Sequence, residues 1–470
     1  MDSLSELPLP FYLCIAASVW LLSKGWSLRF EGWGIPLIGV VVTAGTWYLL
    51  DPLYNDYNQY LREVGPDNLS KAFWEVLIFF ISLGFLAPVM NHKINSDLVG
   101  GGSQIIQMMR NKEIEQPVFQ DQIARLGAVL ILAWMLLMAV ALVRVNFDFI
   151  GLFFPYLGEK AQPWARDRIG GGFDSLIALA GYLQIMLTAL LGVTFALALR
   201  PSTMLISGLG YFLAAPAFLF DRTRNTMLAI LLPGLMALVT LRIRSSMVMK
   251  LVVLTISFLA LESWMKFVID NRDMMSMSEA FKSGGTKDLT VKNRKHLGFN
   301  MLEELGYINY YIEQGSYKVN WGERYFAELV NPIPRVLWPG KPLIGIDYAI
   351  ARGMAYGELG AKSGGVAASV STGMIGQGVV NFGGFFGAIA SAFLMSIWIA
   401  VLARQDLQGR DVGHLLLYAI GLVLTYNMGR DITLLTIYPF VFGWLLLKFM
   451  KTNSSASLSE TISHETGSVR

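Results

Sequence analysis

Residues 126–143 read LGAVLILAWMLLMAVALV and carry no ionisable side chain. A run of this length extends about 27 Å as an α-helix, close to the hydrocarbon thickness of a bilayer. Similar apolar runs recur through the 470 residues and predict an all-α polytopic membrane protein with about eleven transmembrane helices. The predicted spans are 9–23, 34–50, 72–90, 126–143, 174–199, 203–220, 226–241, 247–263, 374–402, 412–428 and 432–449.

The composition agrees with this class and excludes several others. Hydrophobic residues make up 54% of the chain and charged residues 15%, whereas a soluble protein carries about a quarter charged residues. The net charge of +3 is too small and too dispersed to predict a nucleic-acid partner. Four histidines and a single cysteine, Cys14, do not fall at metal-ligand spacings, so we expect no metal and no internal disulfide.

The spans divide the chain into four parts: transmembrane helices over 1–263, a long polar loop over 264–373, further transmembrane helices over 374–450, and a Ser-rich tail over 451–470. Lys and Arg are more numerous in the short loops on the side opposite the long loop. The long loop is therefore predicted to face outward and the carboxyl terminus to face the cytoplasm. The tail has no apolar periodicity and is predicted to be disordered.

Two features of the later chain suggest local departures from simple spans. The block 374–402 is longer than one span and contains Asn381-Phe382-Gly383-Gly384, which predicts a broken or re-entrant start. In the long loop, residues 301–326 place apolar side chains at helical spacing and predict an amphipathic helix on the outer leaflet. The aromatic residues there fit either an interfacial belt or stacking platforms for sugar rings. His296 is the only histidine of this loop.

Residues 331–342 read NPIPRVLWPGKP. Four prolines exclude a regular helix or a central strand, because each lacks a backbone donor and restricts the residue before it. The segment is predicted to be a rigid loop that carries Arg335, Trp338 and Lys341. Two interpretations stay open: a rigid anchor in which Arg335 bonds to backbone carbonyls and Trp338 lies in the headgroups, or one wall of an anion site.

Three arginines stand in short turns on the predicted outer side, where positive charge is disfavoured. Arg222 and Arg224 lie between two spans, and Arg430 lies between the last two. They fit ion pairs with neighbouring aspartates or snorkelling side chains. They also fit an anion site at headgroup level, which suits a pyrophosphate.

Residues 334–342 resemble the PRxLWPxKP signature of bacterial oligosaccharide repeat unit polymerases (O-antigen polymerase, Wzy type). An arginine-bearing turn before a span, here at 222–224, and an "NFG" segment after the long loop, here Asn381-Phe382-Gly383, are similar to features of that family. One position departs from the family pattern. Members usually carry an acidic residue a few positions before the NFG, where this chain has Gln377.

The resemblance implies a glycosyltransferase of the bacterial inner (cytoplasmic) membrane with a GT-C-like architecture and a periplasmic long loop. Such enzymes polymerise lipid-linked oligosaccharide repeat units, taking the glycan from a polyprenyl pyrophosphate carrier, and need no cofactor. The implied partners are the polyprenyl-pyrophosphate-linked oligosaccharide, the bilayer, a flippase and a chain-length regulator. Two alternatives stay open: an O-antigen-ligase-like transferase, and a transporter or flippase for a polar lipid.

Breaking a glycosyl–pyrophosphate bond leaves negative charge on the phosphates, which fixed cations stabilise, and the acceptor hydroxyl needs a base. Acidic candidates for the base are Glu323, Glu328, Asp347, Glu358 and Asp431. We predict catalytic roles for Arg335, Asp347 and Glu323. The predicted pyrophosphate and substrate ligands are Arg222, Arg224, Lys341, Arg430, Trp338 and Asn381.

Overall fold

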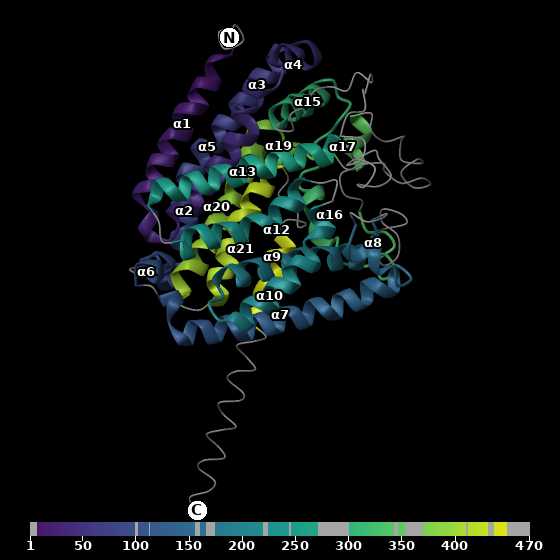
Figure 1. Ribbon diagram of the computed structural model, residues 1–470. Coiled ribbons are helices and arrows are strands. Elements are labelled where there is room, and N and C mark those ends of the chain that lie inside the picture. Colours follow the sequence, from purple (N-terminus) through teal and green to yellow (C-terminus); the bar gives the residue numbers. More distant parts are fainter. Residues whose placement is uncertain are drawn as a thin grey trace, which may run out of the picture.

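The computed structural model describes residues 7–98, 102–111, 113–155, 160–165, 174–219, 224–243, 246–270, 300–342, 346–352, 370–409, 412–430 and 437–448. These residues form helices and turns, and none of them forms a strand (Figure 1). The predicted all-α class is therefore confirmed for the described part of the chain.

Six helices of the described part are long and apolar enough to cross a membrane. They are α1 (Leu9–Ser27), α5 (Pro66–Ile94), α7 (Pro117–Arg144), α9 (Asp174–Leu197), the pair α10 (Pro201–Ala214) and α11 (Pro216–Leu219), and α20 (Gly384–Gln408). Helices with shorter apolar stretches coincide with the other predicted spans: α2 (Gly34–Ala44) with the π-helical turn η3 (Gly45–Leu49), α12 (Arg224–Ala237), α13 (Met247–Asp270), α21 (Val412–Met428) and Ile437–Lys448. The described helices are thus consistent with a helical membrane protein, and eleven spans remain a prediction.

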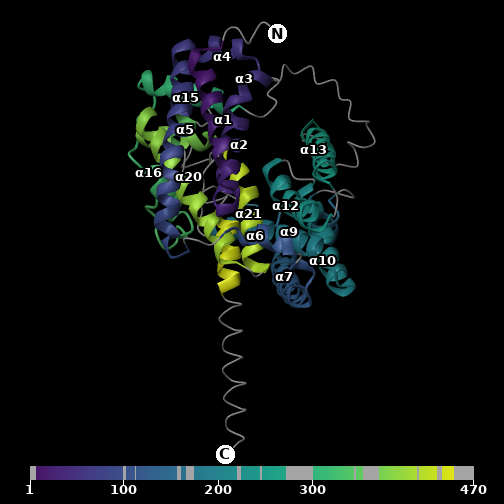
Figure 2. The ribbon, with the colours of Figure 1, turned by 90° about the vertical axis from the view of Figure 1, so that its left-hand side faces the viewer.

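The helices fall into two groups joined by α21. In one group α1, α2, α5 and α20 pack together, and in the other α7, α9, α10 and α12 do so. Helix α21 contacts members of both groups, and Figure 2 shows it between them. Close packing uses glycine: a Cβ on Gly234 of α12 would lie 3.1 Å from the backbone of Gly192 on α9.

The overlong apolar block at 374–402 is broken, as predicted. Helix α19 (Gly373–Phe382) ends at Gly383, whose positive φ of 78° suits glycine, and α20 then runs back along it. The Ser391 hydroxyl donates to the carbonyl of Met374 at 2.8 Å. In one straight helix these residues would lie about 25 Å apart, so α19 and α20 form a tight helical hairpin.

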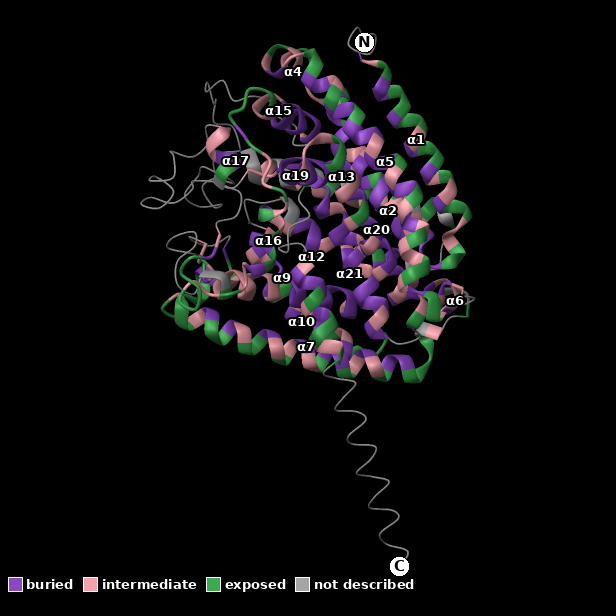
Figure 3. Cartoon of the chain, turned by 180° about the vertical axis from the view of Figure 1, so that it is seen from behind, coloured by how far each residue is buried: buried purple, intermediate pink, exposed green. Residues whose placement is uncertain are grey.

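The predicted helix after residue 300 is present as α15 (Met301–Glu313), but it does not lie on a surface. Its first nine residues are all buried, and α15 is purple over this stretch in Figure 3. It packs against α5 and α19, and the amide of Asn309 donates to buried Glu75 of α5 at 3.1 Å. The prediction of a surface helix is wrong because Glu303 and Glu304, which look solvent-facing in sequence, are also buried.

Short helices gather at the two ends of the bundle. Helix α6 (Gln104–Asn111) lies at one end, with its Ile105 N–H donating to Asp406 of α20 at 2.9 Å. Helices α8 (Phe149–Phe153), α16 (Glu323–Val330) and α17 (Ile346–Ala351) lie at the opposite end (Figures 1 and 3). The remaining short elements are η2 (Arg29–Glu31), α3 (Asp51–Tyr54), α4 (Tyr57–Val64), η4 (Ser96–Leu98), η5 (Glu113–Glu115) and η6 (Leu238–Arg242).

Candidate functional site

The start of α19 is held by the turn that follows α21. The N–H of Gly373 donates to the carbonyl of Arg430 at 2.7 Å, and that of Met374 donates to Gly429 at 3.1 Å. The N–H of Ile375 donates to the Tyr48 hydroxyl at 2.9 Å. These contacts satisfy donors that a helix start leaves open. They also place the exposed Arg430 at the first turn of α19.

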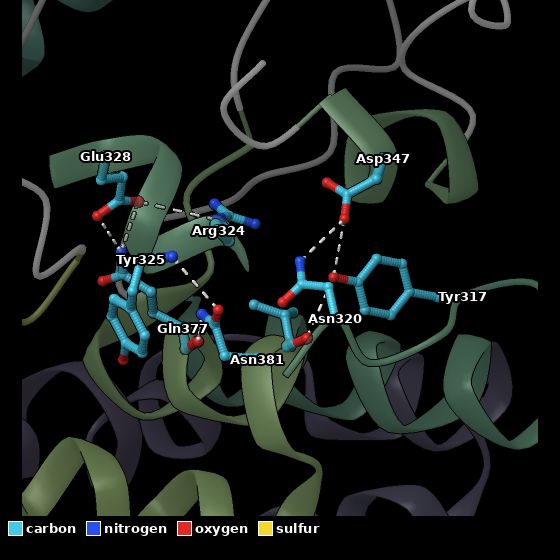
Figure 4. A network of polar contacts seen from close by, with 9 residues as sticks. Tyr317, Asn320, Arg324, Tyr325, Glu328, Asp347, Gln377 and Asn381 are labelled. Atoms are coloured by element: carbon cyan, nitrogen blue, oxygen red, sulfur yellow. Dashed lines mark hydrogen bonds and ion pairs between the residues drawn. The ribbon is translucent and has the colours of Figure 1, made fainter. Parts of the chain in front are cut away.

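The other end of α19 receives α16. The amide of Gln377 donates to both carboxylate oxygens of Glu328, at 2.7 and 2.8 Å. One turn later, Asn381 accepts from the Tyr325 N–H at 3.4 Å and donates to the Gln377 carbonyl at 2.7 Å (Figure 4). Gln377 and Asn381 share one helix face because they are four residues apart. Helix α16 thus supplies a buried carboxylate at Gln377.

A charged pair is buried where α16 meets α19. The Arg324 guanidinium lies 3.9 Å from the Glu328 carboxylate, and both side chains are about 5% exposed. The two residues are one helical turn apart, so they face the same neighbour. A buried ion pair of this kind adds little net stability, because both charges lose their hydration, but removing one partner leaves the other charge buried and uncompensated.

Asp347 is an accessible carboxylate of this region. It stands in the first turn of α17, is exposed, and accepts from the Tyr317 hydroxyl at 3.0 Å and the Asn320 amide at 3.4 Å. The same hydroxyl lies 3.2 Å from the Val380 carbonyl of α19 (Figure 4). Burial, with the neighbouring Asp347 charge, raises the pKa of Tyr317, so the phenol keeps its proton and orients Asp347.

Helix α17 is anchored to α15 through Glu304. Its carboxylate accepts from the Tyr348 hydroxyl and lies 3.4 Å from the Arg352 guanidinium. That guanidinium also lies over the Tyr307 ring, 3.4 Å from the ring centre. The contacts fix the helix that carries Asp347 on a buried part of the bundle.

The cations of the proline-rich loop bind the loop itself. Arg335 donates to the carbonyls of Pro339 at 3.1 Å and Pro342 at 3.4 Å. The Lys341 ammonium is buried and donates to the carbonyls of Asn331 and Ile333, both at 2.8 Å. Burial, and secondarily the charge of Arg335, lowers the pKa of Lys341. These contacts support the rigid-anchor interpretation of the loop.

The other predicted residues fall into three classes. Trp338 packs edge-to-face on Phe326, with ring centres 6.3 Å apart, and Glu323 is exposed in the first turn of α16. Arg224 begins α12, and its side chain lies outside the described part of the structure. The predicted residues outside the described part of the chain are Arg222, His296, Glu358, Asp431 and the tail 451–470.

The structure therefore brings together Asp347, Asn381 and the first turn of α16, and it places Arg430 at the far end of α19. Arg324, Tyr317 and Asn320 belong to this network and are not among the predicted site residues. A signal was present for Arg324, because Arg and Glu at i and i+4 on one short helix often pair. Among the described residues, no group of three His, Cys, Asp or Glu side chains could hold a metal ion.

Comparison with known proteins returned no matching family model, no matching curated protein and no matching solved structure.

Proposed function

We propose that this protein is a membrane glycosyltransferase that polymerises lipid-linked oligosaccharide repeat units at the outer face of the bacterial inner membrane. The observation that carries the proposal is the arrangement along α19. Its first turn bonds to the Arg430 backbone, and its Val380 carbonyl lies at the hydroxyl of Tyr317, the residue that orients Asp347. The resemblance of residues 334–342 to the polymerase signature supports the same function.

The spacing suits the reaction. Residues 373 and 380 are about 10 Å apart along a helix, enough for a sugar residue between a cation at one end and a base at the other. The acceptor hydroxyl passes its proton to Asp347, and its oxygen forms the bond to the anomeric carbon of the donor. The bond from that carbon to the pyrophosphate oxygen breaks, and the departing pyrophosphate carries the negative charge away.

Arg430 is the cation best placed for that charge. Its turn bonds to the start of α19. The start of α19 in turn bonds to Ser391 of α20, which lies about 10 Å along α20 from Gly384, the first residue of that helix. The Arg430 side chain is exposed, so an anionic ligand has access to it. Arg222 and Arg224 are proposed to join it, since α12 packs against α21. Glu328, being buried, is assigned to docking α16 rather than to proton transfer.

A glycan gel from a strain that lacks the gene tests the proposal. Loss of the polymerase leaves single repeat units on the acceptor that normally carries the full ladder. Accumulation of full-length chains that are not attached to their acceptor would indicate the ligase-like alternative. An unchanged ladder would refute both transferase functions and leave the transporter alternative.

A further inference from the structure

Beyond Glu323, which is exposed in its first turn, helix α16 buries its charged side chains and exposes two large apolar ones. Its buried face carries the charged Arg324 and Glu328, which are 5% and 4% exposed. Its outward face carries Phe326 and Leu329, which are 50% and 66% exposed. A helix against water places its apolar stripe inside and its charges outside. The outward face of α16 is therefore built to meet an apolar medium.

The apolar stripe continues into the proline-rich loop. Ile333 follows Leu329 by four residues, and Val336, Leu337 and Trp338 come next, all of them exposed. Leu337 is the most exposed, at 76%. The loop cannot turn these side chains inward easily, because Arg335 and Lys341 tie its backbone together. We call the six residues the α16 apolar face: Phe326, Leu329, Ile333, Val336, Leu337 and Trp338.

This face lies next to a helix end that is itself apolar and exposed. Tyr325 of α16 contacts Phe382 at the end of α19, with ring centres 6.2 Å apart. Phe385 and Phe386 follow in the first turn of α20 and are 57% and 64% exposed. Because α20 is long and apolar enough to span the membrane, these two side chains face lipid. Figure 2 shows α16 at the edge of the molecule, and α16 packs against α19.

We propose that the α16 apolar face is immersed in the lipid bilayer at this end of the molecule, at the level where headgroups meet acyl chains. The face is continuous with the lipid-facing end of α20, so bilayer lipid rather than a protein partner covers it. Trp338 and Phe326 at its rim are aromatic residues of the kind enriched at that boundary. The immersion holds the network of Arg324, Glu328 and Gln377 directly beneath the face, and it does not depend on glycosyl transfer.

Site-directed fluorescence in nanodiscs tests the immersion. Leu329→Cys and Leu337→Cys are labelled with a small environment-sensitive fluorophore, the unsubstituted chain with its buried Cys14 serving as the labelling blank. Quenching is measured with lipids that carry a nitroxide near the top of the acyl chain. Phe386→Cys is the lipid-facing reference. Ser316→Cys is the water-facing reference, because Ser316 is exposed in the turn between α15 and α16.

We expect both labels to be quenched as strongly as the label at 386 and several-fold more than the label at 316. Quenching no greater than at 316, with full access to aqueous iodide, would overturn the proposal. Protection from both quenchers would also overturn it, because a protein surface would then cover the face. If either cysteine variant is not recovered as monodisperse protein, Phe326→Cys and Val336→Cys replace it with the same expected result.

Discussion

Glu328 is buried with its carboxylate between Arg324 on its own helix and Gln377 on α19. A carboxylate beside the buried Arg324 guanidinium offsets the charge of that group. Whether α16 or α19 carries the carboxylate matters less than that one is present. Under the proposed function, this carboxylate takes the place of the acid that polymerases with a similar signature usually carry near position 377. In this chain the negative charge comes from α16 instead of α19.

Exchanging the carboxylate and the amide between positions 328 and 377 tests the need for a negative charge beside Arg324. Glu328→Gln should lower the stability of the folded protein by about 3 kcal/mol, because it leaves the arginine charge buried without its carboxylate. Gln377→Glu should also destabilise, because two carboxylates would then face each other. The double variant Glu328→Gln/Gln377→Glu should recover most of the loss. Thermal unfolding in detergent measures all three, and additive losses in the double variant would contradict the interpretation.

Asp51 is a buried carboxylate that fixes the start of α15. Its oxygens accept from Tyr60 and Asn55, both at 2.8 Å, and from the N–H groups of Leu302 and Glu303 at 2.8 and 3.2 Å. Burial raises the pKa of Asp51 from 3.8 to about 7, although these four donors lower it. The folded state therefore holds the Asp51 proton to a higher pH than the unfolded chain does.

The sign of the resulting pH dependence follows from that difference. The contribution of Asp51 to stability is fully present below pH 3.8 and is lost as the pH rises through about 7. Thermal unfolding midpoints should fall as the pH rises from 5 to 7. Asp51→Asn should flatten this part of the profile, while the exposed Asp67→Asn should leave it unchanged. An identical slope in Asp51→Asn would show that another group carries the dependence.

At the scale of elements, the hairpin of α19 and α20 positions the candidate site. A Cβ on Gly387 would lie 2.5 Å from the backbone of Gly378, and backbone atoms cannot rotate away as a side chain can. Gly387→Ala should therefore force the two helices apart at a cost above about 3 kcal/mol. Loss of monodisperse protein after purification, or a lower unfolding midpoint, measures the effect.

Gly45 provides the matched control. It has ordinary helical dihedrals, and a Cβ placed on it would have no neighbouring atom within 4 Å, so the alanine methyl group meets open space. Gly45→Ala should leave stability unchanged or raise it by up to about 1 kcal/mol, because alanine restricts the unfolded chain. If both variants behave alike, the hairpin is not held by the glycine contact.

Local sequence patterns predicted part of these elements well. Long apolar runs predicted the apolar helices, and the Asn381-Phe382-Gly383-Gly384 segment predicted the break, because both depend on neighbouring residues alone. The placement of α15 does not follow from local pattern, since Glu304 is buried by partners at 348 and 352. The sequence also suggested a phosphate partner for Arg335 and Lys341. Each proline lacks a backbone N–H, however, so carbonyls of the loop lack backbone donors. The Arg335 and Lys341 side chains donate the missing hydrogen bonds.

At the scale of the whole molecule, two helix groups joined by α21 carry loop elements at one end, and the α19–α20 hairpin links those elements to the bundle. The bias of Lys and Arg predicts which end faces outward. It could not predict which acidic residue serves the site, because Glu323, Glu328 and Asp347 are separated only by burial and by hydrogen-bond partners. Asp347 is exposed, unlike Glu328, and its carboxylate is oriented by Tyr317 and Asn320.

The most direct test of the proposed function is chain extension by the purified protein in proteoliposomes supplied with polyprenyl-pyrophosphate-linked repeat units. The wild-type protein is expected to produce a ladder, and Asp347→Asn to extend chains at least about 100-fold more slowly, as for loss of a general base. Asp67→Asn, which changes an exposed carboxylate in the first turn of α5, should extend at the wild-type rate. A wild-type protein that forms no ladder, or an Asp347→Asn protein that extends as fast as wild type, would contradict the proposed function.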